Sequence, residues 1–180
     1  MKNSSMTAPI QSLVGAAVPD LRLQSTAGGE VSLNTLSGWT VLFFYPRTGN
    51  PNEPAPSGLA DISGTKGCTP QACEFRNNHG SFLNLGVENL YGVSSQSTDY
   101  QLELATRLCL TYPILSDPTC DVGHALGMRL IELSGSWFYA RTTLVIKNGV
   151  IVKVFDDIAD PESNARDVAN WIKAQRANPA

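Results

Sequence analysis

One continuous apolar stretch decides the fold: it reads Thr40-Val41-Leu42-Phe43-Phe44-Tyr45 and ends at Pro46. Strands that are buried on both faces show this unbroken hydrophobic pattern, which is typical of the middle of a parallel β-sheet. Pro46 ends the strand because proline has no backbone N–H to donate to a neighbouring strand. Residues 40–45 therefore predict a central strand that is covered on both faces.

Patterns on either side of this strand predict further strands and helices. Residues 20–33 alternate between apolar and polar side chains around Gly28-Gly29, which predicts a β-hairpin. After the central strand, a helix is expected from about Thr69, because Pro70 suits the first turn of a helix. Further along, the pattern predicts strands at 90–94 and 114–115 and helices at 97–110 and 119–127.

The clearest local signal is Asn148-Gly149, which separates two β-rich runs at 142–147 and 150–155. Both residues accept the positive φ angles of a type I′ turn, so these runs predict a second β-hairpin. Asp160-Pro161 then predicts the start of a last helix, in which residues 165–172 carry one apolar face. Because strands alternate with helices, we expect an α/β fold with a central mixed β-sheet flanked by helices.

The length and charge of the chain limit the classes of protein to consider. It has 180 residues, which fits one ordinary domain, and 42% of them are hydrophobic, which is enough for a core. Only 16% are charged, the net charge is -3, and the 13 Lys and Arg residues form no cluster. Proteins that bind nucleic acid usually carry a basic face, so a nucleic-acid partner is not expected.

The sequence also argues against a membrane span and a secretion signal. The longest apolar run, Val41–Tyr45, is far shorter than the roughly 20 residues that cross a bilayer. Residues 1–7 carry one Lys and lack the apolar core of a signal peptide. We therefore expect a cytoplasmic protein with no membrane partner. In that reducing compartment, an unburied cysteine is more often catalytic or a metal ligand than part of a stabilising disulfide.

Among the four cysteines, Cys68 has the surroundings of a reactive group. It follows Gly64-Thr65-Lys66-Gly67, where a glycine-rich loop enters the helix expected after it. The free N–H groups and the dipole at a helix N-terminus favour an anion such as a thiolate, and Lys66 adds a positive charge. The alternative is a small cysteine buried in the core. We favour the reactive role, because a cysteine at a glycine-flanked loop tip is seldom a core residue.

Cys73 follows five residues after Cys68, a C-x4-C spacing rather than the C-x2-C of disulfide oxidoreductases. In an intact α-helix, residues i and i+5 lie about 140° apart with about 7.5 Å of rise, which separates their Cα atoms by roughly 8.7 Å. A disulfide needs Cα atoms within about 7 Å. The two cysteines can therefore bond only if the first turn of the helix unwinds.

The other two cysteines carry weaker signals. Cys109 shares an apolar helical face with Leu102 and Ala105, so we expect it to pack in the core. Cys120 precedes His124 by four residues, and one such pair is weak evidence for a metal site. The nucleotide-binding patterns G-x-G-x-x-G and G-x4-G-K-[ST] are absent from the sequence. We expect neither a cofactor nor a metal.

Several motifs of the chain follow one another in a familiar order. They are Val41–Pro46, Thr65–Thr69, Ala72–Arg76, Gly92–Ser94, Tyr112–Asp117 and Arg141–Ile146. Together they resemble the peroxiredoxins, in particular the bacterioferritin-comigratory-protein or peroxiredoxin Q group. The resemblance runs from about residue 15 to residue 173.

The resemblance implies a thioredoxin-like fold and a thiol-dependent peroxidase of the atypical 2-Cys type. In that family pattern, Cys68 is the peroxidatic cysteine, Thr65 and Arg141 assist it, and Cys73 is the resolving cysteine. The implied substrates are hydrogen peroxide and organic hydroperoxides, and the implied reductant is thioredoxin or a similar dithiol. The implied role is antioxidant defence, by a monomer or a weak homodimer.

The chain departs from the family pattern before the peroxidatic cysteine. The family proline lies seven residues before that cysteine, whereas Pro46 lies 22 residues before Cys68, so about 15 residues are inserted. Residues 46–70 also hold five prolines and four glycines, which is typical of a long functional loop. We expect one thioredoxin-like domain at 15–176, with an inserted loop at about 47–64 and a flexible lead-in at 1–14. Pro46 joins the candidate site residues.

Two other functions stay open on the sequence. A thioredoxin-like disulfide reductase calls for C-x2-C and for a proline before the strand at 142–146, where this chain has Ala140-Arg141. A redox sensor or binding module that signals through a Cys68–Cys73 disulfide uses the same cysteines. Only the peroxidase consumes peroxide continuously, so turnover separates it from the sensor.

Overall fold

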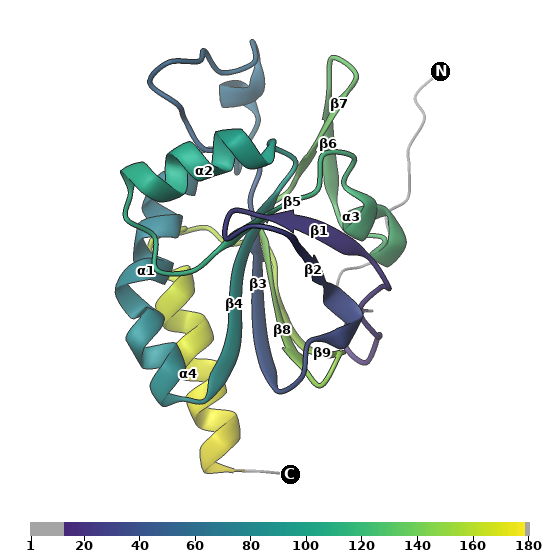
Figure 1. Ribbon diagram of the computed structural model, residues 1–180, viewed down its shortest axis with the longest axis vertical. Helices are drawn as coiled ribbons and strands as arrows, with labels where there is room; N and C mark the ends of the chain where they lie inside the picture. Colours follow the sequence, from purple (N-terminus) through teal and green to yellow (C-terminus); the bar gives the residue numbers. More distant parts are fainter. Residues whose placement is uncertain (1–12, 179–180) are drawn as a thin grey trace.

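The computed structural model describes residues 13–178, which form a central seven-stranded mixed β-sheet with helices on both faces (Figure 1). The strand order is β2-β1-β5-β4-β3-β8-β9. The strands are β1 (Arg22–Ser25), β2 (Glu30–Ser32), β3 (Trp39–Phe44), β4 (Val87–Ser94), β5 (Ile114–Ser116), β8 (Thr142–Lys147) and β9 (Val150–Phe155). The expected α/β fold and its N-terminal hairpin are confirmed.

Strand β3 is the central strand that the apolar stretch predicted. It pairs in parallel with β4 and antiparallel with β8, and β4 pairs in parallel with β5. Successive side chains of a strand point to opposite faces. Val41 and Phe43 accordingly lie in one hydrophobic cluster with helices α1 (Cys68–Asn84) and α4 (Asn164–Ala177), and Leu42 and Phe44 lie in a second cluster on the other face. An unbroken apolar run is what a strand between two cores requires.

The helices begin and end near the positions that the sequence predicts. They are α1 (Cys68–Asn84), α2 (Thr98–Arg107), α3 (Asp121–Leu126) and α4 (Asn164–Ala177). Helices α1 and α4 lie side by side against one face of the sheet, and α3 lies on the other side (Figure 1). The Asn148-Gly149 turn has positive φ at both residues and joins β8 to β9 as expected.

Helix α2 buries a different face from the one predicted. Tyr100, Gln101 and Leu104 are buried, whereas Leu102 is 46% exposed and Cys109 is exposed. The expectation that Cys109 packs in the core is therefore wrong. The helix ends at Arg107, and Cys109 has a left-handed backbone with φ +50°, so the helical spacing does not reach it.

One hairpin has no counterpart in the sequence-based prediction. Strands β6 (Leu130–Leu133) and β7 (Ser136–Tyr139) pair as a separate two-stranded sheet. Their turn is Ser134-Gly135, with positive φ at both residues. Tyr139 packs against Phe44, with 4.8 Å between ring centroids. This contact ties the small hairpin to the end of the central strand.

The inserted loop is held at both ends. Thr48 is buried and its N–H donates to Gln96, while Tyr100 donates to the Thr48 carbonyl oxygen. At the other end Leu59 is buried within a short 3₁₀ helix, η3 (Leu59–Asp61). Residues 51–55 between these anchors are exposed. The loop is thus fixed where it leaves β3 and where it approaches α1.

Packed residues extend slightly beyond the expected domain bounds of 15–176, which stay a prediction. Leu13 is buried in the core, two residues before the expected start at residue 15, and α4 ends at Ala177. Most of the expected lead-in, residues 1–12, lies outside the described residues. None of the helices within residues 13–178 has the length and apolar character needed to span a bilayer.

Candidate functional site

Cys68 is the first residue of α1, and its thiol lies inside the protein. Gly67 precedes it as the N-cap with φ +90°, a backbone that glycine adopts without strain. Cys68 is only 3% exposed and belongs to the same hydrophobic cluster as Tyr45 and Phe75. A Cβ atom on Gly67 would lie 2.8 Å from Cγ of Pro161, so the loop after β9 covers this turn. The glycine-flanked position predicted a less buried sulfur, and this packing is the reason for the difference.

The guanidinium of Arg141 contacts the Cys68 sulfur. Arg141 lies just before β8 and is 4% exposed. Its Nη2 lies 3.3 Å from Sγ of Cys68 and also donates to the carbonyl oxygens of Lys66, at 2.7 Å, and Gly64, at 3.3 Å. Arginine stays protonated in proteins. The fold therefore places a permanent positive charge beside a thiol that is 73 residues away in the chain.

Thr65 lies beside Cys68, and its hydroxyl group is turned toward the inserted loop. Its hydroxyl group donates to the carbonyl oxygens of Leu59 and Ile62, both at 2.8 Å, rather than to the sulfur. The Cys68 thiol instead lies 3.6 Å from the carbonyl oxygen of Thr65. The inserted loop supplies both acceptors, and a hydroxyl has one proton to donate. The lone pairs of the Thr65 hydroxyl remain able to accept a hydrogen bond.

Tyr45 lies in the same hydrophobic cluster as Cys68, and Pro46 follows it at the end of the central strand. Pro46 is buried directly after the central strand. Tyr45 is fully buried, and its hydroxyl donates to Oε1 of Gln101 at 2.8 Å. Burial raises the pKa of Tyr45, and the nearby Cys68 thiol raises it further. Tyr45 is thus a neutral neighbour of the sulfur within the same hydrophobic cluster.

Cys73 lies in the same unbroken helix as Cys68, because α1 runs from Cys68 to Asn84. The thiol of Cys73 is free and half-buried. The helical separation of roughly 8.7 Å between the two Cα atoms therefore holds in this structure. Bonding between them requires the start of α1 to unwind.

Three buried polar residues near Arg141 were missed by the sequence analysis. Gln71 Oε1 accepts a hydrogen bond from Arg141 Nη1, and Gln71 Nε2 donates to Oδ1 of Asn164 at 3.0 Å. The hydroxyl of Thr143 donates to the same Asn164 oxygen at 2.8 Å. All four side chains are buried. The only local hint was that Gln71 and Asn164 are polar residues beside apolar ones, near the start of α1 and at the start of α4.

Known proteins with similar sequences and folds identify the family. The family model that matches the chain is Redoxin, over residues 13–170. The chain belongs to the Redoxin family. A putative peroxiredoxin of Mycobacterium tuberculosis is 32% identical over 173 residues, which is 95% of this chain and 98% of the relative. The chloroplastic peroxiredoxin Q of Arabidopsis thaliana is 30% identical over 161 residues, which is 89% of this chain and 67% of that longer relative.

Solved structures agree with this family. The crystal structure of peroxidoxin BcpB from Mycobacterium tuberculosis has a TM-score of 0.72 at 26% identity, over 89% of this chain and 96% of that one. Peroxiredoxin Q of Xanthomonas campestris shares the fold, with a TM-score of 0.70 at 22% identity over 89% of this chain and 94% of that one. This Redoxin protein is a peroxiredoxin of the peroxiredoxin Q or bacterioferritin-comigratory-protein group, with a thioredoxin-like fold. Peroxiredoxins are thiol-dependent peroxidases, which makes it an oxidoreductase of that class.

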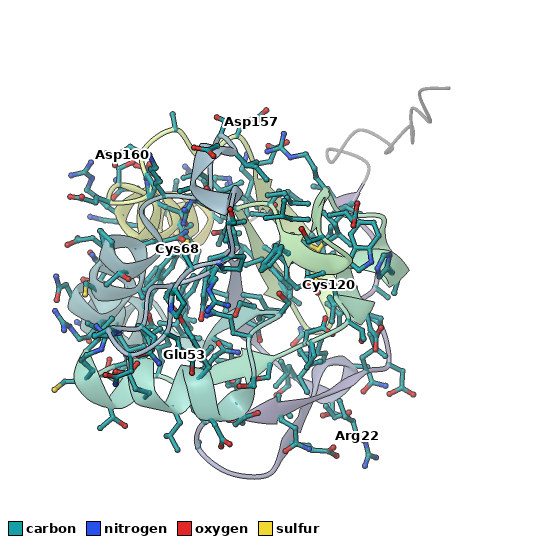
Figure 2. The ribbon with its side chains drawn as sticks, turned by 90° about the horizontal axis from the view of Figure 1, so that it is seen from above. Arg22, Glu53, Cys68, Cys120, Asp157 and Asp160 are labelled. Carbon is teal, nitrogen blue, oxygen red and sulfur yellow. The ribbon has the colours of Figure 1, made fainter. Side chains whose placement is uncertain are left out.

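The two remaining cysteines of this peroxiredoxin lie in different surroundings. Cys120 is completely buried, and burial, with the nearby Asp117 carboxylate, raises the pKa of its thiol to about 12. Cys120 belongs to the hydrophobic cluster on the opposite face of the sheet from Cys68, and Figure 2 shows the two well apart. Cys109 is exposed beside the end of α2. Neither cysteine lies in the site around Arg141.

Proposed function

We propose that this protein reduces hydrogen peroxide and organic hydroperoxides through a Cys68 sulfenic acid. Cys73 resolves that acid as an intramolecular disulfide, and thioredoxin or a similar dithiol restores the two thiols. The role is antioxidant defence. The observation that carries the proposal is the contact of 3.3 Å between the Cys68 sulfur and the Arg141 guanidinium at the N-terminus of α1.

In the first step the Cys68 thiolate attacks the terminal oxygen of the hydroperoxide. An S–O bond forms and the O–O bond breaks, and its electron pair leaves with the other oxygen as an alkoxide or hydroxide. That oxygen takes up a proton and departs as an alcohol or as water. The cationic Arg141 and the N–H groups at the start of α1 stabilise the negative charge on sulfur and on the leaving oxygen. The product is the sulfenic acid of Cys68.

Thr65 orients the peroxide as a hydrogen-bond acceptor in this proposal. Its proton is directed to the carbonyl oxygens of Leu59 and Ile62. A lone pair of its hydroxyl can then accept the O–H of the terminal peroxide oxygen. That hydrogen bond turns the oxygen toward the sulfur of Cys68. The inserted loop thus takes part in orienting Thr65.

In the second step Cys73 resolves the sulfenic acid. After the start of α1 unwinds, the Cys73 thiolate attacks the Cys68 sulfur. The S–S bond forms, the S–O bond breaks, and the hydroxide that leaves takes up a proton to become water. A dithiol reductant then exchanges with the disulfide through a mixed disulfide, and its own two thiols become oxidised.

The partner and the compartment belong to the proposal. A dithiol of the thioredoxin type fits a cysteine pair that forms a short intramolecular disulfide. A cytoplasmic location stays a prediction, since the plant relatives are named as chloroplastic. A monomer or weak homodimer stays a prediction as well.

The test is continuous peroxide consumption in the presence of thioredoxin, thioredoxin reductase and NADPH. Wild-type protein should turn over many equivalents of hydrogen peroxide, and Cys68→Ser should consume none. Cys73→Ser should form one equivalent of sulfenic acid and then stall. Cys109→Ser, an exposed cysteine outside the site, is the matched control and should cycle like the wild type.

Three outcomes would contradict the proposal. Full activity in Cys68→Ser would exclude its role as the peroxidatic cysteine. Normal cycling of Cys73→Ser would exclude its role as the resolving cysteine. A wild-type protein that oxidises once and is not turned over by any dithiol would act as a redox sensor.

A further inference from the structure

A hollow of about 330 Å³ lies at the carboxyl ends of three parallel strands, and we call it the Arg47 hollow. Strand β3 leads into Arg47, β4 leads into Ser95 and Gln96, and β5 leads into Pro118 and Thr119. Because β4 pairs in parallel with both β3 and β5, these ends meet at one edge of the sheet. Ligands of open α/β sheets bind at that edge, and small-molecule sites have volumes of roughly 300–1,000 Å³.

The inserted loop and the β6–β7 hairpin complete the walls of the Arg47 hollow. The inserted loop supplies Arg47 and Pro56, and the hairpin supplies residues 135–138. Neither Cys68 nor Arg141 is among the residues that line it. The hollow thus has a lining of its own, and it depends on the segment by which this chain departs from the family pattern.

Arg47 supplies the only charge among the described residues that line the hollow. Its Cζ lies 4.7 Å from the centre of the Tyr100 ring, a cation–π contact that orients the guanidinium. Its Nε is buried and has no hydrogen-bond partner in the part of the chain that the structure describes. A buried donor without an acceptor is unfavourable, so Arg47 calls for an acceptor from a ligand.

The carboxylate of Glu53 approaches Arg47 without satisfying it. The distance from Arg47 Nη2 to Glu53 Oε2 is 4.0 Å, which is longer than a hydrogen bond. The Glu53 side chain is 57% exposed, and ion pairs of exposed groups contribute little. An anion that reaches Arg47 at hydrogen-bond distance would therefore displace Glu53 at little cost.

The rest of the lining suits the body of an organic acid. Its apolar members are Pro56, Pro118, Trp137 and Phe138, and its hydroxyl-bearing members are Ser95, Thr119 and Ser136. Aromatic rings such as that of Trp137, which is 40% exposed, stack on other planar groups. The guanidinium of an arginine binds a carboxylate by two parallel hydrogen bonds. One cation matches a singly charged carboxylate better than a phosphate, which carries more charge.

We propose that the Arg47 hollow binds a planar organic carboxylate. The carboxylate of the ligand replaces Glu53 at the Arg47 guanidinium, and its ring lies against Trp137. The ligand joins the inserted loop to the ends of β4 and β5 and to the β6–β7 hairpin. This site goes beyond the proposed peroxidase function, because it uses neither Cys68 nor a peroxide.

The test is the binding of anthranilate, a planar aromatic carboxylate, to the reduced full-length protein. Isothermal titration calorimetry measures Kd for anthranilate, for its neutral amide anthranilamide and for phenyl phosphate. The variants are Glu53→Gln and Arg47→Met, which removes the charge but keeps an unbranched side chain over Tyr100. Arg22→Met removes the same charge from the exposed side of β1, outside the hollow, and is the matched control.

Wild-type protein should bind anthranilate at least about tenfold more tightly than anthranilamide, because hydrogen bonds between charged groups are the stronger ones. Arg47→Met should weaken the binding of anthranilate by at least about tenfold. Glu53→Gln should tighten it by about two- to fivefold, and Arg22→Met should bind like the wild type. The NMR signal of the Trp137 indole N–H should shift on binding.

Equal binding of anthranilate and anthranilamide by the wild type would overturn the proposal without any variant. Unchanged affinity in Arg47→Met, or NMR shifts that gather around Arg141 instead of Trp137, would overturn it as well. Tighter binding of phenyl phosphate would reject the carboxylate as the ligand class. An unchanged Kd in Glu53→Gln would reject the displacement of Glu53. Peroxide consumption tests the proposed function separately.

Discussion

At the scale of single residues, the orientation of Arg141 depends on the direction of two amide groups. Asn164 Oδ1 accepts from both Gln71 and Thr143, so the Gln71 NH₂ group points to Asn164 and its carbonyl oxygen points to Arg141. A reversed Gln71 amide would present a donor to a guanidinium that can only donate. Asn164, 96 residues after Cys68, is therefore a positioning residue for the arginine that contacts the sulfur.

Replacing Asn164 by Leu should slow the reaction of Cys68 with peroxide. The substitution removes the acceptor that holds the Gln71 amide, and misplacing a catalytic group by about 1 Å can cost up to about 100-fold in rate. We expect a loss of between roughly 10- and 100-fold in the second-order rate constant for Cys68 oxidation. Stopped-flow measurements with hydrogen peroxide check this value.

A double-mutant cycle with Gln71→Met separates positioning from simple destabilisation. If Asn164 acts through Gln71, Asn164→Leu should cause little further loss in the Gln71→Met background, since coupled residues are not additive. Fully additive losses would show that Asn164 acts only on general stability. The free energies of unfolding of all four proteins supply the comparison.

The exposed and buried cysteines should differ in reactivity toward thiol reagents. Cys109 is exposed, whereas Cys120 is fully buried and has a thiol pKa raised to about 12. The thiolate is the reactive form, so a maleimide at pH 8 should modify native Cys109 rapidly and Cys120 only after unfolding. Peptide mapping by mass spectrometry measures both. Rapid labelling of Cys120 in the native protein would contradict the burial described here.

At the scale of elements, the turn before α1 is held by two glycines with different surroundings. Gly64 has φ +83° and open space where a Cβ would lie, whereas Gly67 has φ +90° and faces Pro161. An L-residue in the left-handed region costs about 1–2 kcal/mol. Gly64→Ala should lose about that much free energy of unfolding, and Gly67→Ala should lose more because of the added contact with Pro161. Urea denaturation measures both losses, and equal losses would show that the contact with Pro161 has no energetic effect.

Helix α1 must change during the proposed catalytic cycle. Cys68 and Cys73 lie in one continuous helix, which keeps their Cα atoms beyond disulfide reach. Oxidation of the wild type should therefore speed amide hydrogen exchange at the start of α1 and lower the helix content. The Cys73→Ser variant, treated with one equivalent of peroxide, should keep its exchange protection. If peptide mapping finds the Cys68–Cys73 disulfide and amide hydrogen exchange at the start of α1 is nevertheless unchanged, the result would contradict the intact helix before oxidation.

At the scale of the whole molecule, the two hydrophobic clusters lie on opposite faces of the sheet and contain no residue of the loop at 47–64. Residues 51–55 are exposed and lie between the anchors at Thr48 and Leu59. Replacing residues 51–55 by a Gly-Ser linker of the same length should shift Tm by less than about 2 °C. Differential scanning calorimetry measures the shift. Leu59→Ala, which empties a buried position, should lower Tm more.

Much of the fold could be predicted because it depends on neighbours in the chain. The unbroken apolar run at 40–45 determined the central strand, and Asn148-Gly149 determined the β8–β9 hairpin, since a type I′ turn needs positive φ at two consecutive residues. The α2 prediction failed at Cys109, because periodicity assumes a continuous helix and this one ends at Arg107. It also failed at Leu102, which lies within the helix but on its exposed face.

The candidate site was only partly visible in the sequence. The glycine-rich loop before Cys68 marked the helix N-terminus, and the order of the motifs singled out Arg141. Nothing local indicated that the sulfur is buried or that the proton of Thr65 is directed toward the inserted loop. These features depend on how the loop packs against α1.

By itself, the sequence determined the strands of the seven-stranded sheet, its two hairpin turns and the chemical types of the site residues, because those follow from local patterns and side-chain chemistry. Only the tertiary structure decided which side chains meet. It placed Arg141 against Cys68 across 73 residues and aligned Gln71 with Asn164 across 93. Such contacts depend on how helices and loops pack on the sheet, which no pattern of neighbouring residues encodes.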